Sequence, residues 1–114
     1  MDYEKYLPHI DVNDGKARVM NNLGLYTTLL KKFKGRQMTE DLIAAIGAND
    51  LPKVGQVAHA LRGTAANLSF PTAHKVVSEI EKLAKGGENC AHLTDELQIV
   101  MTDLESAIAE LTSA

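Results

Sequence analysis

Residues 58–70 of the chain read AHALRGTAANLSF, an alanine-rich run interrupted by a histidine, an arginine and a glycine. Extended back to Pro52 and plotted at about 100° per residue, the pattern predicts one amphipathic helix. This helix is expected to run from the N-cap residue Asp50 to about Asn67. Its buried side is predicted to consist of Val54, Val57, Leu61, Ala65 and Leu68. His59 lies on the opposite side, so we expect its ring in solvent near the middle of the helix.

The neighbours of His59 on the exposed side are small or polar, namely Pro52, Gly55, Gln56, Arg62, Gly63 and Ala66. Gly55 and Gly63 lie one turn before and one turn after His59, although each costs a helix about 1 kcal/mol relative to alanine. We interpret the two glycines as clearing space for another molecule to approach the imidazole. Arg62 is within reach of the same patch, and its planar guanidinium suits phosphate oxygens. The arrangement predicts a histidine that accepts a phosphoryl group.

Helical spacing continues on both sides of this helix. Upstream, an apolar stripe over residues 23–33 predicts a helix that Gly35 helps to end, followed by a shorter helix up to Gly47. Downstream, Ser69 and Pro71 are expected to start a helix that ends at Gly86-Gly87, and a last helix covers residues 93–111. The inward-facing residues of the two downstream helices are expected to be Ala73, Val76, Val77, Ile80, Leu83, Ala84, Leu93, Leu97, Val100, Leu104, Ala107 and Leu111.

The N-terminal residues are expected to add smaller elements. Residues 3–8 suit a short helix or a strap, and residues 14–21 a second short helix that Gly15 weakens. Together the patterns predict a single domain over residues 1–114 with an all-α fold. Its architecture is expected to be an antiparallel four-helix bundle with short N-terminal helical additions.

Composition narrows the class of protein. The chain has 114 residues, which suits one domain, and its 4% of aromatic residues favours helices over a sheet. Its formal net charge of -3 argues against a nucleic-acid-binding domain, since such domains are usually basic. The lone Cys90 cannot form an internal disulfide and fits a reducing cytosol. No apolar run reaches the roughly 18 residues of a membrane span, and the residues after Met1 do not read as a signal peptide. We therefore expect a cytoplasmic protein, which we take to be a monomer. The start at Met1 favours a free-standing chain over a piece cut from a larger kinase, and both alternatives stay open.

The stretch His59–Leu68 (HALRGTAANL) resembles the signature of histidine-containing phosphotransfer (HPt) domains, in which a histidine-x-leucine-lysine-glycine run precedes small residues, asparagine and leucine. The likeness extends upstream to Ile10 and downstream to Ile80-Glu81, so it covers about residues 10–86, and the last helix fits by pattern only. Two residues depart from the family pattern. Arg62 stands where lysine is usual, and Ser69 stands where a glycine commonly ends the helix.

The resemblance implies a phosphocarrier without autokinase activity rather than an enzyme. His59 would carry the phosphoryl group on Nε2, with Arg62 and Gly63 supporting it. The group would come from the aspartate of one receiver domain and pass to another, and the receiver would supply Mg²⁺, so no cofactor is expected here. The implied partners are response-regulator receiver domains and a hybrid sensor histidine kinase. The docking face for a receiver is expected to include Gly55, Gln56 and Ala66.

Other readings of the histidine differ in what they require. A sensor-kinase dimerisation domain typically has an acidic residue after its histidine and a proline soon afterwards, whereas Ala60 follows His59 and the next proline is Pro71. A metal site is not expected, because the other histidines are scattered along the chain, at His9, His74 and His92. The alternative that stays open is a helical adaptor that binds a partner through the same face without being phosphorylated. Lys82 and Lys85 add charge to the site only if their helix packs beside His59.

Overall fold

The computed structural model describes residues 3–113, and all its regular elements are helices. In chain order they are η1 (Glu4–Tyr6), α1 (Val12–Ala17), α2 (Leu23–Lys32), α3 (Gly35–Gly47), α4 (Leu51–Leu68), α5 (Pro71–Lys85), η2 (Ala91–Leu93) and α6 (Thr94–Ser113). No strand occurs in this part of the chain, so the predicted all-α fold is confirmed. No helix within residues 3–113 combines the length and the apolar character that crossing a membrane requires.

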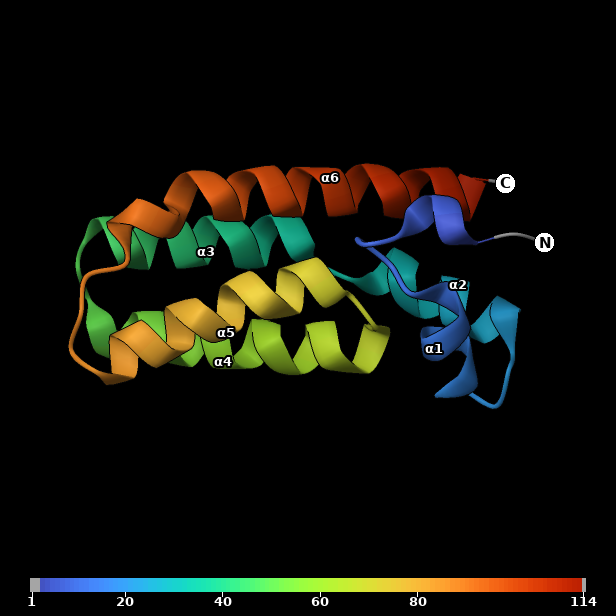
Figure 1. Cartoon of the computed structure of the whole chain (residues 1–114), viewed down its shortest axis with the longest axis horizontal. Coiled ribbons are helices and arrows are strands. Elements are labelled where there is room, and N and C mark those ends of the chain that lie inside the picture. Colours follow the sequence, from blue (N-terminus) through green and yellow to red (C-terminus); the bar gives the residue numbers. More distant parts are fainter. Residues whose placement is uncertain (1–2, 114) are drawn as a thin grey trace.

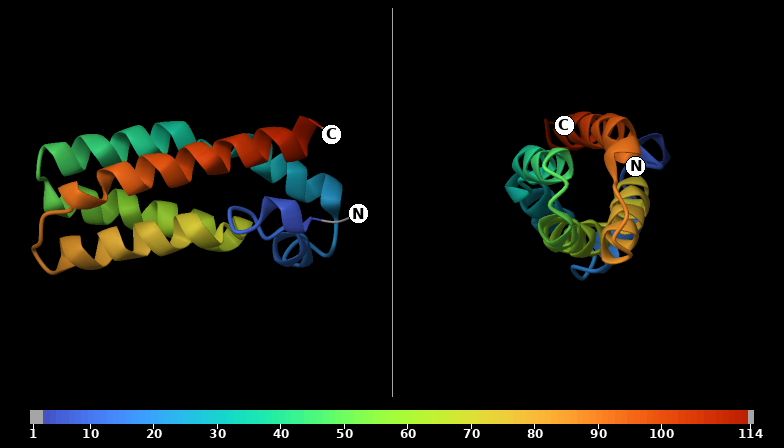
Figure 2. Two further views of the ribbon diagram at one scale, coloured as in Figure 1. Left: turned by 45° about the horizontal axis from the view of Figure 1, so that its top comes forward. Right: turned by 90° about the vertical axis from the view of Figure 1, so that its left-hand side faces the viewer.

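The four long helices α3 to α6 lie side by side along the long axis of the molecule, which measures 44 × 22 × 21 Å. Each packs on two others: α4 contacts α3 and α5, and α6 contacts α3 and α5. Successive helices run in opposite directions (Figure 1). Seen end-on, they surround a common axis (Figure 2). The smaller elements α1, α2 and η1 gather at one end of the bundle, where α4 turns into α5.

Helix α4 is built as its sequence indicates, with one shift in its buried side. Asp50 caps the first turn, its side chain accepting a hydrogen bond from the backbone N–H of Lys53. The fully buried residues follow alternating steps of four and three, at Val54, Ala58, Leu61 and Ala65, with Leu68 nearly buried. Val57, which we expected in the core, is only partly buried, and Ala58 takes its place. The reason is that α4 packs between two neighbours, and its seam follows the four-three spacing of a bundle helix.

The turn after α4 depends on a serine in a conformation that usually selects glycine. Ser69 has φ 62° and ψ 62°, in the left-handed region. The N–H of Phe70 donates to the carbonyl of Ala65, which closes a Schellman-type end of the helix. A non-glycine residue in this region costs about 1–2 kcal/mol, so the surroundings of Ser69 must hold it there. Only one residue, Phe70, then separates the turn from α5.

Other helix boundaries differ from the expectations. Gly35 begins α3 instead of ending α2, and with 13 residues α3 is longer than the 10 of α2. Helix α1 begins at Val12 and ends at Ala17, earlier than residues 14–21, because Asp11 serves as its N-cap. Gly15 is buried inside α1 because the ring of Tyr26 packs against it, and a β-carbon there would collide with that ring.

One hydrophobic core joins the bundle to the N-terminal elements. It contains buried residues from Tyr6 to Leu111, including residues of α1 and α2. On α5 the expected inward residues are buried except Leu83, which is only partly buried, and on α6 Val100 and Ala107 are partly buried while Met101 is buried. Leu93 is buried but belongs to η2.

Candidate functional site

A hollow of about 570 Å³ lies between α4 and α5 and contains the exposed face of His59. It runs from His59 toward the first residues of α4 and the last residues of α5. Its lining consists of Leu51, Pro52, Gly55, Gln56, His59, Glu81, Ala84, Lys85 and Gly87. A larger hollow of about 890 Å³ between α2, α3 and α6 contains neither histidine nor cysteine in its lining. Of these two hollows, only the smaller one is lined by an imidazole, that of His59, so we take it as the candidate site.

The ring of His59 is held at Nδ1 by a neighbouring carboxylate, while much of its side chain is exposed to solvent. Its side chain is 64% exposed, as expected from the sequence, and its Nδ1 lies 2.8 Å from Oε2 of Glu81. Glu81 projects from α5 and is only 5% exposed. An ionised carboxylate only accepts hydrogen bonds, so Nδ1 must carry the proton that it donates to Glu81. In the neutral ring this leaves the lone pair on Nε2.

Besides the imidazole of His59, Glu81 contacts two positively charged side chains. Arg62 Nε lies 2.8 Å from Oε1 of Glu81, and Lys85 Nζ lies 3.1 Å from Oε2. The Arg62 contact is an ion pair rather than a well-aligned hydrogen bond, since its N–H finds no acceptor in line. Arg62 Nη2 also lies 3.3 Å from His59 Nδ1. Because Nδ1 already carries a proton, that contact is a close approach of two donors.

The ionisation of Glu81 follows from these partners. Burial raises the pKa of the Glu81 carboxyl, but the hydrogen bonds from Lys85 and His59 and the charge of Arg62 outweigh burial, so the pKa lies below its ordinary value. Glu81 is therefore the charged, fixed acceptor that the tautomer of His59 requires. The two cations exceed its single negative charge, which leaves a positive field around the imidazole.

The predicted supporting residues are only partly brought together. Gly55 and Gln56 line the hollow beside His59. Gly63 and Ala66 lie further along α4 and outside its lining, with Gly63 exposed and Ala66 partly buried. A β-carbon on Gly55 or Gly63 would meet nothing within 4 Å, so both glycines border open space.

Two residues of the site, Glu81 and Lys85, are not among the site residues predicted from the sequence. From the sequence, Glu81 is indicated only by the family resemblance, and Lys85 belongs to the site only if its helix packs beside His59. A signal for Glu81 does exist: it lies on the apolar stripe of α5 among Val77, Ile80 and Ala84, where charged residues are rarely buried unless they are paired. Lys85 follows one turn later on the same face. Lys82, in contrast, does not line the hollow.

The remaining histidines lie outside the hollow. His74 is on α5, His92 is exposed in η2, and His9 has its Nε2 4.0 Å from Oδ2 of Asp103. Within residues 3–113, no three side chains of His, Cys, Asp or Glu come close enough to hold a metal ion. The hollow thus presents one imidazole, one buried carboxylate and the ammonium group of Lys85, while Arg62 pairs with Glu81 from outside the lining.

The sequence model of the Hpt domain family matches residues 34–112. The match includes α6 and omits residues 10–33. The resemblance seen in the sequence covers about residues 10–86 and relates the last helix to the family by pattern only. None of the curated proteins and none of the solved structures matches the chain. The family match covers well over half of the chain and contains His59, Arg62 and Glu81. The chain therefore belongs to the Hpt domain family, whose members are phosphocarriers for histidine phosphotransfer in the phosphorelays of two-component signalling.

Proposed function

We propose that His59 accepts a phosphoryl group on Nε2 from the aspartyl phosphate of one receiver domain and passes it to the aspartate of another. The observation that carries this proposal is the exposed ring whose Nδ1 is held at 2.8 Å by the buried Glu81. The contact fixes the tautomer with its lone pair on Nε2, the nitrogen a partner can reach. An orienting group of this kind is a common feature of activated nucleophiles.

The transfer step balances without any further reactant. The Nε2 lone pair attacks phosphorus in line, the bond from phosphorus to the aspartyl oxygen breaks, and the aspartate leaves as a carboxylate. The ring then bears phosphate on Nε2 and a proton on Nδ1, with a positive charge that Glu81 neutralises. Reversal toward a second receiver breaks the P–N bond and restores the neutral ring. No proton has to leave Nδ1 in either direction.

Arg62 and Lys85 supply the positive charge that phosphoryl transfer needs. The transition state spreads negative charge over the phosphoryl oxygens, so nearby cations stabilise it. Both cations reach Glu81 from positions beside the ring, and Lys85 is 67% exposed and lines the hollow. Its flexible stem allows its ammonium group to move from the carboxylate to the arriving phosphate.

The receiver would dock over the hollow and along the exposed face of α4. The hollow offers apolar contact at Leu51, Pro52 and Ala84. Along the exposed face, the small residues Gly55, Gly63 and Ala66 lie beside the larger Gln56 and Arg62. We infer that the chain works as a monomeric cytoplasmic carrier between receiver domains, one of them in a hybrid sensor kinase, and that it has no autokinase activity. The receivers would bring their own Mg²⁺.

Incubation with a ³²P-labelled phospho-receiver tests the proposal. We expect acid-labile, alkali-stable label on the wild-type chain and none on His59→Gln, with the fold unchanged by circular dichroism because the side chain is exposed. His9→Gln, His74→Gln and His92→Gln are the matched controls and should be labelled like wild type. Label that survives His59→Gln would show that the site is elsewhere. Receiver binding without any label would favour the non-phosphorylated adaptor.

A further inference from the structure

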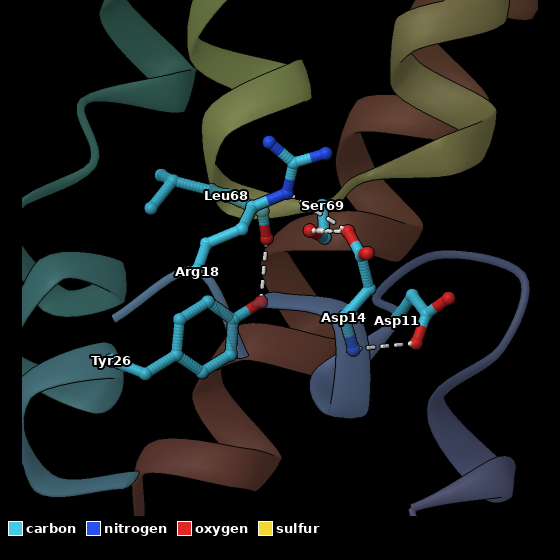
Figure 3. Close-up of polar contacts among 6 residues, drawn as sticks. All are labelled: Asp11, Asp14, Arg18, Tyr26, Leu68 and Ser69. Carbon is cyan, nitrogen blue, oxygen red and sulfur yellow. Dashed lines mark hydrogen bonds and ion pairs between the residues drawn. The ribbon is translucent and has the colours of Figure 1, made fainter. Parts of the chain in front are cut away.

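The segment before the family match is attached to the turn between α4 and α5 (Figure 3). The backbone N–H of Asp11 donates to the carbonyl of Ser69 at 2.9 Å. The hydroxyl of Tyr26 donates to the carbonyl of Leu68, the last residue of α4. The hydroxyl of Ser69 donates to Oδ2 of Asp14. We name these three residues, Asp11, Asp14 and Tyr26, the N-terminal clasp.

The clasp supplies hydrogen-bonding partners that hold Ser69 in its left-handed conformation. A glycine would adopt φ 62° freely, whereas a serine needs partners to remain there. Asp14 provides an acceptor for the Ser69 hydroxyl, and Arg18 orients Asp14 by donating to the same Oδ2 at 3.0 Å. The hydrogen bonds from Ser69 and Arg18 lower the pKa of Asp14, so it is a charged acceptor. Tyr26 is fully buried, and its burial raises its pKa, so its hydroxyl stays a donor.

The turn connects the two helices that carry the site. Phe70 lies eleven residues after His59 and eleven residues before Glu81, so the two side chains face each other at the same height of one helical hairpin. Eleven helical residues span about 16 Å. A change of about 5° in the angle between α4 and α5 would move side chains at that height by about 1.4 Å, given that rise per residue. A shift of this size that separates the two helices lengthens the 2.8 Å contact beyond hydrogen-bonding distance.

We propose that the N-terminal clasp positions His59 against Glu81 by fixing the left-handed turn at Ser69, from the opposite end of the α4–α5 hairpin. The clasp residues are positioning residues, since none of them lines the hollow. The effect on phosphotransfer rests on the function proposed above. The effect on the imidazole does not, because the contact between His59 and Glu81 exists before any phosphate arrives.

Asp14→Ala tests the proposal, with the tautomer of His59 as readout. Long-range ¹H–¹⁵N spectra of the full chain, recorded where the ring is neutral, give the ratio of the Nδ1–H to the Nε2–H form. We expect this ratio to fall about threefold in Asp14→Ala, within the range of couplings carried by packed helices. Asn13→Ala, an exposed neighbour on α1, is the matched control and should keep the wild-type ratio. Tyr26→Phe should lower the ratio in the same direction and serves as the second variant if Asp14→Ala does not fold.

A second substitution, Ser69→Gly, distinguishes an effect of the clasp on the position of His59 from a general effect on the stability of the fold. In the Asp14→Ala background, Ser69→Gly should restore the tautomer ratio, because glycine holds the turn without a side-chain acceptor. A folded Asp14→Ala chain with a lower melting temperature but the wild-type ratio would overturn the proposal, and so would a ratio that Ser69→Gly does not restore. If His59 proves not to accept phosphate, the proposed function fails while the tautomer result stands on its own.

Discussion

At the scale of single residues, the site depends on one buried carboxylate. Glu81 contacts His59, Arg62 and Lys85, and its side chain is 5% exposed. A carboxylate without partners at that depth would be strongly destabilising. The three partners offset this cost, and in exchange the carboxylate fixes which ring nitrogen of His59 is free. Glu81 thus determines the reactivity of a side chain on another helix.

Replacing Glu81 by glutamine should slow phosphotransfer while the fold is kept. The amide oxygen can still accept a hydrogen bond from the Nδ1–H, but the charge-assisted hydrogen bond becomes a neutral one of about half the strength. The loss of roughly 1–1.5 kcal/mol corresponds to about tenfold in rate. Initial rates of label transfer from one phospho-receiver measure the effect. Glu79→Gln, exposed on the same helix, is the control, and equal rates for Glu81→Gln and wild type would remove Glu81 from the mechanism.

The depressed pKa of Glu81 also predicts a dependence of stability on pH. A carboxyl whose pKa is lower in the folded state stabilises the fold above its ordinary value of 4.5, and this contribution is lost as the pH falls through the folded value. The free energy of unfolding of wild type should therefore fall more steeply below pH 4.5 than that of Glu81→Gln. Urea titrations of both chains between about pH 3 and 7 measure the two slopes. Parallel curves would mean that the pKa of Glu81 is not lowered by folding.

At the scale of elements, α4 carries two glycines where alanine would make a better helix. Gly55 lines the hollow, Gly63 lies on the exposed face, and both border open space. The helix therefore gives up some stability along its exposed side, whereas its other side is packed at Val54, Ala58 and Leu61. This asymmetry suits a surface that a partner approaches closely.

Substitutions at the two glycines should separate stability from access. Gly63→Ala should raise the free energy of unfolding by up to about 1 kcal/mol, since the methyl group meets no atom and alanine is the better helix former. Gly55→Gln and Gly63→Gln should slow transfer from a receiver without lowering the melting temperature. Ser106→Gln, exposed on α6, is the bulky control and should transfer at the wild-type rate. Wild-type rates for both glutamine variants at the glycines would mean that the receiver does not dock on this face.

The elements also show which features a sequence can predict. The cap at Asp50, the outward His59 and the end of α5 follow from local signals and are present in the structure. The burial of Ala58 in place of Val57 depends on where neighbouring helices lie, which periodicity within one helix does not specify. The left-handed Ser69 depends on Asp14, 55 residues earlier in the chain. Such long-range partners have no local signature.

At the scale of the whole molecule, one core connects the N-terminal elements with the bundle. Buried residues of η1, α1 and α2 belong to the same cluster as those of α3 to α6. The N-terminal segment is also joined to α6 by the ion pair of Lys5 with Glu110, with 3.2 Å between the charged atoms. An exposed pair of this kind adds at most about 1 kcal/mol, so the shared core is the main connection. We expect the described chain to unfold as one unit.

The aromatic residues allow this expectation to be measured. All three tyrosines (Tyr3, Tyr6 and Tyr26) lie in the N-terminal segment, and the chain has no tryptophan. Tyrosine fluorescence therefore reports on the N-terminal elements, while far-ultraviolet circular dichroism is dominated by the long helices. Thermal or urea transitions followed by the two signals should coincide, as they do for a two-state protein. A fluorescence transition that precedes the loss of helix would show that the N-terminal segment detaches first.

The open position of His59 has a consequence for how long a signal lasts. The side chain is 64% exposed and lines an open hollow, so water as well as a receiver could reach a phosphoryl group on the ring. For the function proposed above, hydrolysis would then compete with transfer to a receiver for a phosphoryl group on Nε2. We therefore expect the lifetime of the phosphorylated chain to shorten as the concentration of unphosphorylated receivers rises.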